Sequence, residues 1–180
     1  MRSSAGVRPR EAHPARHSTF WRTPPRMPTL TTPGLGPFEY RDEDVFTFPE
    51  GLPSFETLRF FVLGQTPEFA PFVFLVSLER PSVRFVCVPV VLLDRNYRFE
   101  LLPGELIPDG LEPGQYSAAS GPHMLLAILT LPEHGPPTAN LVAPILINPA
   151  RRLGVQVILG GSAYSHVTPL LPLPDGGSPC

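Results

Sequence analysis

Short runs of apolar residues recur along the chain, and proline, glycine or charged residues separate them. The run Phe72–Val76 is apolar at every position, which is typical of a β-strand that is covered on both faces. In Tyr97–Leu101, aromatic and apolar residues alternate with Arg98 and Glu100, which indicates a strand with one face toward solvent. We therefore expect many short strands rather than long helices.

The pattern predicts an all-β fold, a single domain of about nine short strands. The expected architecture is a small antiparallel β-barrel-like domain, closed or nearly closed, with a two-sheet sandwich as the alternative. A single helical turn is expected in the loop Leu102–Glu112. The runs that predict strands are Thr29–Thr32, Phe38–Arg41, Val45–Phe48, Leu58–Leu63, Phe72–Leu78, Val83–Val88, Tyr97–Leu101, Met124–Leu131, Ala139–Ile147 and Leu153–Leu159.

The run Ala139–Ile147 carries a proline, Pro144, in its middle, and Asn140 and Asn148 bracket its apolar part. Proline cannot donate a hydrogen bond to a neighbouring strand, so this strand is expected at a sheet edge or at a bulge. An exposed edge is where a sheet can pair with another protein. The sequence therefore predicts partner contact at Asn140, Pro144 and Asn148, and a binding protein rather than an enzyme.

The two ends of the chain differ in composition from the part between them. Residues 1–27 are rich in arginine and proline, which predicts a disordered tail; an over-extended start, with Met27 as the true initiator, is the alternative. An organellar transit peptide is also Arg-rich, but the prolines oppose its amphipathic helix. Residues 171–180 are expected to form a flexible C-terminal tail. The folded domain is expected over residues 28–170.

Charge is distributed unevenly along the chain. Residues 1–36 carry six arginines and one acidic residue, whereas residues 37–180 carry eight arginines and fifteen acidic residues, a net charge of −7. Nucleic-acid phosphates need clustered positive charge, so we expect no direct nucleic-acid binding by the domain. No apolar run approaches the roughly 20 residues of a membrane span, and no secretory signal is evident. The two cysteines suggest no disulfide framework, which fits a reducing cytoplasm.

Residues that could carry chemistry are sparse. Cys87 lies among valines, where burial raises the pKa of a thiol and lowers its reactivity, so catalysis by Cys87 with a histidine is the least favoured hypothesis. His123, His134 and His166 are widely spaced, unlike metal ligands. No nucleophile elbow, P-loop or dinucleotide fingerprint occurs. We therefore expect no enzyme, no metal and no cofactor.

Two motifs resemble the signature of a known family. Phe48-Pro49-Glu50-Gly51-Leu52-Pro53, followed by Phe55-Glu56, resembles the F-P-x-G-L-P-G-F-E signature of the bacterial flagellar assembly factor FliW family. Asn140–Asn148, read as N-L-V-A-P-I-L-I-N, resembles the family's N-L-x-A-P-I-x-I-N. The resemblance runs in order from about Thr29 to Leu170.

This resemblance implies a non-catalytic, cytoplasmic regulator with a small β-barrel-like domain, monomeric when free. Members of the family bind flagellin, the filament subunit, and antagonise the RNA-binding translational repressor CsrA. Export of flagellin would free the regulator to capture CsrA and so relieve repression of flagellin translation. The acidic domain suggests a further hypothesis. Bound to the repressor, it would place negative potential near the RNA site and so disfavour RNA binding there. The alternative function is a β-barrel that binds a small apolar ligand in its interior.

The motif residues also have structural interpretations. Phe48, Pro49, Gly51, Leu52, Pro53 and Phe55 are expected to be mainly structural, with the glycine and prolines shaping a turn and the aromatic rings anchoring it. Asn140 and Asn148 can hydrogen-bond the local backbone at strand ends, and this structural role is favoured over partner contact for them. Ser54 stands where the family usually has glycine, and a positive φ there would cost about 1 kcal/mol.

Overall fold

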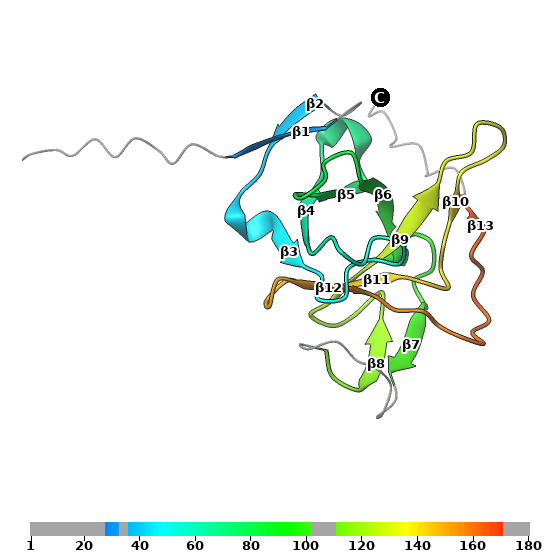
Figure 1. Cartoon of the computed structure of the whole chain (residues 1–180). Helices are drawn as coiled ribbons and strands as arrows, with labels where there is room; N and C mark the ends of the chain where they lie inside the picture. Colours follow the sequence, from blue (N-terminus) through cyan, green and yellow to red (C-terminus); the bar gives the residue numbers. More distant parts are fainter. Residues whose placement is uncertain (1–27, 33–35, 102–110, 171–180) are drawn as a thin grey trace, which may run out of the picture.

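The computed structural model describes residues 28–32, 36–101 and 111–170 of the chain. These residues form thirteen strands and three 3-10 helices (Figure 1). None of the helices among them is long and apolar enough to cross a membrane. The strands are β1 (Thr29–Thr32), β2 (Gly36–Glu39), β3 (Val45–Thr47), β4 (Phe60–Gly64), β5 (Val73–Ser77), β6 (Arg84–Pro89), β7 (Arg98–Leu101), β8 (Gly114–Ser117), β9 (Met124–Thr130), β10 (Thr138–Ala139), β11 (Ile145–Asn148), β12 (Leu153–Gln156) and β13 (Thr168–Pro169). The 3-10 helices are η1 (Asp42–Asp44), η2 (Pro67–Phe69) and η3 (Val90–Leu92).

Seven of the strands close into a barrel. They are hydrogen-bonded in the order β11-β12-β3-β4-β5-β6-β9, and β9 pairs with β11 to complete the ring. Neighbours in the ring are antiparallel except β12 and β3, which are parallel and share the single pair Leu153 and Thr47. The predicted β-barrel is therefore confirmed, and the ring closes where the sandwich alternative would have left two sheets.

Alternating side chains divide the buried residues between the inside and the outside of the barrel. In β5, Val73 and Leu75 join the interior cluster, whereas Phe74 and Val76 join a cluster on the outer face. All five residues of β5 are buried, as the uninterrupted apolar run predicts. The interior cluster consists of Phe46, Phe48, Leu52, Leu58, Phe61, Val73, Leu75, Cys87, Leu126, Ile145 and Ile147.

Two hairpins cover the outside of the barrel, at the top and the bottom of the view in Figure 1. The β1–β2 hairpin places Leu30 against Phe74 and Val76. The β7–β8 hairpin places Phe99 and Tyr116, which stack with their ring centroids 5.3 Å apart, in the cluster over the outer face of β9. A strand such as β5 is therefore buried on both faces even in a chain of this size.

The prediction of one strand over Ala139–Ile147 is wrong. The segment forms β10, then a turn from Asn140, and then β11, which begins at Ile145. The inference that Pro144 marks a sheet edge is also wrong, because β11 is paired with β12 on one side and with β9 on the other. The proline lies just before the strand, where its missing N–H removes no barrel hydrogen bond.

Other differences concern short or weakly patterned elements. Strands β8 and β13 were not predicted, since β8 carries one apolar side chain, Tyr116, and β13 contains two residues, one of them Pro169. The second predicted strand lies two residues earlier, at Gly36–Glu39. The helical turn expected within Leu102–Glu112 falls largely on residues 102–110, which lie outside the described residues, as do the tails 1–27 and 171–180.

Candidate protein-interaction site

The first motif follows β3 and closes one part of the barrel interior. Phe48 is 0% exposed, and its ring meets Phe61 edge to face with the centroids 4.9 Å apart. Its N–H donates to the carbonyl of Arg59, at 2.7 Å, so the motif continues the pairing of β3 with β4. Gly154 of β12 lies directly over this ring, and a Cβ there would lie 2.3 Å from Phe48 Cζ. The phenylalanine is therefore a core residue.

The rest of the first motif forms a tight turn. Gly51 has a φ of +69°, and a Cβ on it would lie 2.7 Å from the carbonyl oxygen of Phe55, so no other residue fits. Leu52 is buried and forms a β-bridge with Phe55. The Phe55 ring meets Phe85 of β6 at a centroid distance of 5.5 Å. Pro49 is half-buried and Pro53 is exposed in the same turn.

Ser54 adopts a positive φ of 69° in this turn. A serine at a positive φ is strained, so Ser54 is expected to lower the stability of the protein, as predicted from the sequence. Its N–H donates to Glu56 Oε1 at 2.7 Å, and hydrogen bonds from the N–H of Glu56 itself and from that of Ser54 lower the pKa of the Glu56 carboxyl. The bond uses the backbone of Ser54, so a glycine would keep it.

The second motif surrounds β11 with two turns. Asn140 Oδ1 accepts hydrogen bonds from the N–H groups of Val142 and Ala143, both at 3.1 Å. Asn148 Oδ1 accepts one from the N–H of Arg151, also at 3.1 Å. Both asparagines are half-buried, whereas Pro144 is buried. The local bonding considered for the asparagines is thus present at each end of the strand.

A buried tyrosine that the sequence did not single out holds the first of these turns. Tyr97 is 0% exposed, and its hydroxyl donates to the carbonyl oxygen of Leu141 at 2.5 Å. Burial, with smaller contributions from Tyr164 and Asp94, raises the pKa of Tyr97 well above its usual value. The tyrosine therefore stays neutral and fixes the turn against the outer face of the barrel.

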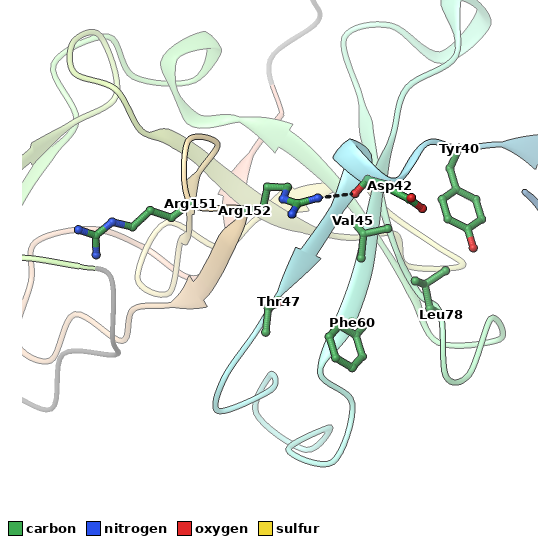
Figure 2. A pocket seen from close by; sticks show the side chains of 8 residues that line it. All are labelled: Tyr40, Asp42, Val45, Thr47, Phe60, Leu78, Arg151 and Arg152. Atoms are coloured by element: carbon green, nitrogen blue, oxygen red, sulfur yellow. Dashed lines mark hydrogen bonds between the residues drawn. The ribbon is translucent and has the colours of Figure 1, made fainter. Parts of the chain in front are cut away.

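An open groove of about 400 Å³ lies on the outer face of β3 and β4 (Figure 2). Phe60, a large side chain that is 46% exposed, lies opposite Thr47 on the neighbouring strand. Arg152 approaches Asp42 from the facing turn, while Arg151 extends away from that turn (Figure 2). The groove is lined by Tyr40, Asp42, Val45, Thr47, Phe60, Leu78, Arg151 and Arg152.

The groove spans the place where the barrel closes through a single strand pair. The N–H of Thr47 donates to the carbonyl of Arg152 at 2.9 Å, and Arg152 Nη1 donates to the carbonyl of Asp42 at 3.0 Å. Arg152 has a positive φ of 52°, and it bonds Thr47 through its main chain and Asp42 through its side chain. The two sides of the groove are thus held together by hydrogen bonds.

The groove residues were missed by the sequence analysis. The one signal was the pair Phe60-Phe61, because adjacent residues of a strand point to opposite faces, so one of the two rings must face outward. Phe61 is 0% exposed inside the barrel, which leaves Phe60 outside. Nothing in the sequence places Arg151 and Arg152, about ninety residues later, in the same groove as that ring.

The groups considered for catalysis lie in settings that do not favour it. Cys87 is 0% exposed in β6, and burial raises the pKa of its thiol to about 12. His134 and His166 are exposed, whereas His123 is half-buried against Tyr116, and burial lowers its pKa. Among residues 28–32, 36–101 and 111–170, no group of three or more His, Cys, Asp or Glu side chains could hold a metal ion.

The barrel interior bears on the small-ligand alternative. Eleven buried apolar residues of the interior cluster occupy it, and partly buried side chains such as Phe55 and Phe85 pack against them. A second groove, of about 220 Å³, lies beside β8 and the turn before β9, on the hairpin that covers the barrel. Both grooves are therefore on outer surfaces, which counts against a ligand held inside the barrel.

Comparison with known proteins gives a consistent result. The family model described as FliW protein matches residues 29–170. The flagellar assembly factor FliW of Caldanaerobacter subterraneus subsp. tengcongensis is 35% identical over 145 residues, which cover 79% of this chain and 92% of the relative. That of Thermotoga petrophila is 36% identical over 132 residues, which cover 72% of this chain and 85% of the relative.

A solved structure agrees with the sequence matches. A crystal structure of the flagellar assembly factor FliW aligns with 81% of this chain and 98% of its own, at a TM-score of 0.63 and 31% identity. The closed barrel and both motifs lie within the matched residues. This chain therefore belongs to the FliW family of flagellar assembly factors.

Proposed function

We propose that this protein binds flagellin and antagonises the RNA-binding translational repressor CsrA by protein–protein contact. Free protein would capture CsrA when flagellin has been exported, and would thereby couple flagellin export to flagellin translation. The observation that carries the proposal is the FliW match over residues 29–170, which include the whole barrel. We place the protein in the cytoplasm, where both partners are made, and expect a monomer when it is free.

The described residues support a non-catalytic role. The buried Cys87, whose raised pKa keeps its sulfur protonated at neutral pH, is a poor nucleophile. The buried side chains of the interior cluster fill the barrel and pack against one another, so the interior is not suited to hold a substrate. A surface that meets another protein is therefore the kind of site that this fold offers best.

Charge supports a particular mode of antagonism. Residues 37–180 carry a net charge of −7, and an RNA-binding partner must carry clustered positive charge. The acidic domain would lie beside the RNA site of CsrA and disfavour RNA at modest salt. Displacement of RNA that is insensitive to ionic strength would contradict this mode while leaving the partnership itself intact.

The turns of the second motif, at the two ends of β11, are proposed to take part in partner binding. Asn140 and Asn148 are half-buried and shape the two ends of β11, so each could contact a partner from its turn. Pro144 is buried and would act by directing the chain between the first turn and the strand. We therefore propose that Asn140 and Asn148 contact a partner and that Pro144 contributes to binding by positioning their turns.

A mixing experiment tests the function. Purified protein is added to CsrA bound to a labelled flagellin leader RNA, and flagellin is then titrated into the mixture. We expect the protein to release RNA from CsrA, and flagellin to restore the CsrA–RNA complex. Failure of the protein to bind either flagellin or CsrA at micromolar concentration would refute the proposal.

A further inference from the structure

We propose that the groove over β3 and β4 docks an acidic, partly apolar segment of a partner protein, and that flagellin rather than CsrA supplies this segment. The inference rests on the proposed function for the identity of the two partners. The groove itself, with its lining residues and hydrogen bonds, is a property of the barrel.

The floor of the groove is suited to apolar contact. Phe60, the first residue of β4, is 46% exposed, and Leu78 and Tyr40, which also line the groove, are half-buried. Aromatic residues and arginine are enriched in the buried centres of protein–protein interfaces, and lysine is depleted there. A groove lined by an exposed aromatic side chain and two arginines thus has the composition of an interface. An apolar side chain of a partner would remove Phe60 from water.

The rim of the groove is suited to carboxylates. Arg151 and Arg152 lie on it, and the one salt bridge among the described residues joins two other residues, Arg41 and Glu43. Arg152 Nη1 donates one hydrogen bond to the backbone carbonyl of Asp42, which leaves most of the five N–H donors of the guanidinium available. Asp42 is the one acidic side chain in the lining, so the two arginines give the lining residues a net positive charge. A groove with a net positive charge, in a domain that is otherwise acidic, favours the binding of an acidic segment.

The same charges distinguish the two proposed partners. CsrA binds RNA, and an RNA-binding surface carries clustered positive charge. Two arginines at the rim would repel such a surface, whereas the acidic remainder of the domain would attract it. Flagellin, the other proposed partner, is not proposed to bind RNA, so this requirement for clustered positive charge does not apply to it. The groove is therefore assigned to flagellin.

The groove is also formed before any partner arrives. The contacts from Thr47 to Arg152 and from Arg152 to Asp42 join its two sides. Asn148 fixes the turn that carries the arginines by accepting the N–H of Arg151. A site that is already held in shape loses less conformational entropy on binding than a flexible one.

Two substitutions test the assignment, each with a matched control. Arg151→Glu reverses one exposed charge at the rim, and Phe60→Ser removes the exposed ring. Arg95→Glu and Leu92→Ser make the same chemical changes at exposed positions in and just after η3, outside the groove. Binding of the full-length proteins to purified flagellin and to purified CsrA is measured by calorimetry at low and at physiological salt.

We expect each groove variant to weaken flagellin binding about tenfold or more, and each control to change it less than about threefold. CsrA binding should remain within about threefold of wild type for all four variants, with Arg151→Glu at most strengthening it. Arg151→Glu should also reduce the salt dependence of flagellin binding, because a charge pair has been lost. Thermal unfolding of each variant identifies any loss of fold, and Arg151→Glu carries the test if Phe60→Ser unfolds.

Three results would overturn the assignment. Flagellin binding by Arg151→Glu that equals wild type would show that the rim is not used. A loss of CsrA binding with flagellin binding retained would assign the groove to the other partner. Wild-type protein that binds neither partner would refute the proposed function as well, so the two failures are distinguishable.

Discussion

Substitution of Gly154 by alanine should destabilise the protein strongly, although it adds one methyl group. The new Cβ would lie 2.3, 2.5 and 2.7 Å from Cζ, Cε2 and Cε1 of Phe48. Each distance is far below the van der Waals separation of two carbon atoms, about 3.5–4.0 Å. The ring has little room to retreat, because Phe48 is 0% exposed and lies 4.9 Å from the centroid of Phe61.

The magnitude follows from the cost of overpacking. An extra methyl group in a well-packed core typically costs about 1–3 kcal/mol. Three clashes with one enclosed ring place Gly154→Ala at the upper end, near 3 kcal/mol of unfolding free energy. For a domain of this size, such a loss lowers the melting temperature by about 10 °C. It would also strain the single pair that joins β12 to β3, since Gly154 follows Leu153 directly.

Denaturant unfolding followed by fluorescence measures this loss. Gly160→Ala is the matched control, because a Cβ there meets no atom within 4 Å, and we expect it to cost nothing. The double variant Gly154→Ala with Phe48→Leu should be less destabilised than the sum of the two single variants, because a smaller side chain relieves the clash. A loss below about 0.5 kcal/mol for Gly154→Ala would refute the packing argument.

Three further predictions concern other parts of the fold. Ser54→Gly should raise the unfolding free energy by about 0.5–1 kcal/mol in the same assay, because serine occupies a positive φ there, and no gain would contradict that strain. Tyr97→Phe should cost about 1–2 kcal/mol, since the buried carbonyl of Leu141 loses its hydroxyl donor; a neutral substitution would mean that water replaces it. Burial alone would raise the pKa of Glu79, but hydrogen bonds from main-chain N–H groups beside β4 lower it below its ordinary value of 4.5. Its contribution to stability should thus be present above that pH and lost as the pH falls through the lowered pKa, and Glu79→Gln should flatten this part of the stability–pH curve.

The barrel could be predicted because the pattern of apolar residues within each strand shows which of its faces are buried. A run such as Phe72–Val76 has no polar position, so it must be covered on both sides whatever its neighbours are. The split between β10 and β11 could not be seen in this way. Its turn is made of apolar residues, Leu141 to Pro144, and the hydrogen bonds of Asn140 and Tyr97 hold it in place. Apolar composition alone made this turn resemble a strand.

The groove was beyond sequence reasoning for a different physical reason. Its floor comes from β3, β4 and Leu78, and its rim comes from the turn before β12. These segments meet only because the ring closes between β3 and β12, and that closure is a single parallel pair, Thr47 with Leu153. No periodicity in either segment specifies so small a contact. The pairing of strands distant in the sequence therefore had to be known before the site could be found.

The signature residues and the groove have different roles in the same barrel. Phe48, Gly51 and Leu52 are buried or fixed by close backbone contact, so substitution there should act mainly through stability. Phe60 and Arg151 are exposed, so substitution there removes little from the core and acts on whatever the groove binds. A motif that closes a barrel can thus identify the family without identifying its interface. Partner binding in this protein should accordingly respond more to the exposed groove residues than to these buried residues of the first motif.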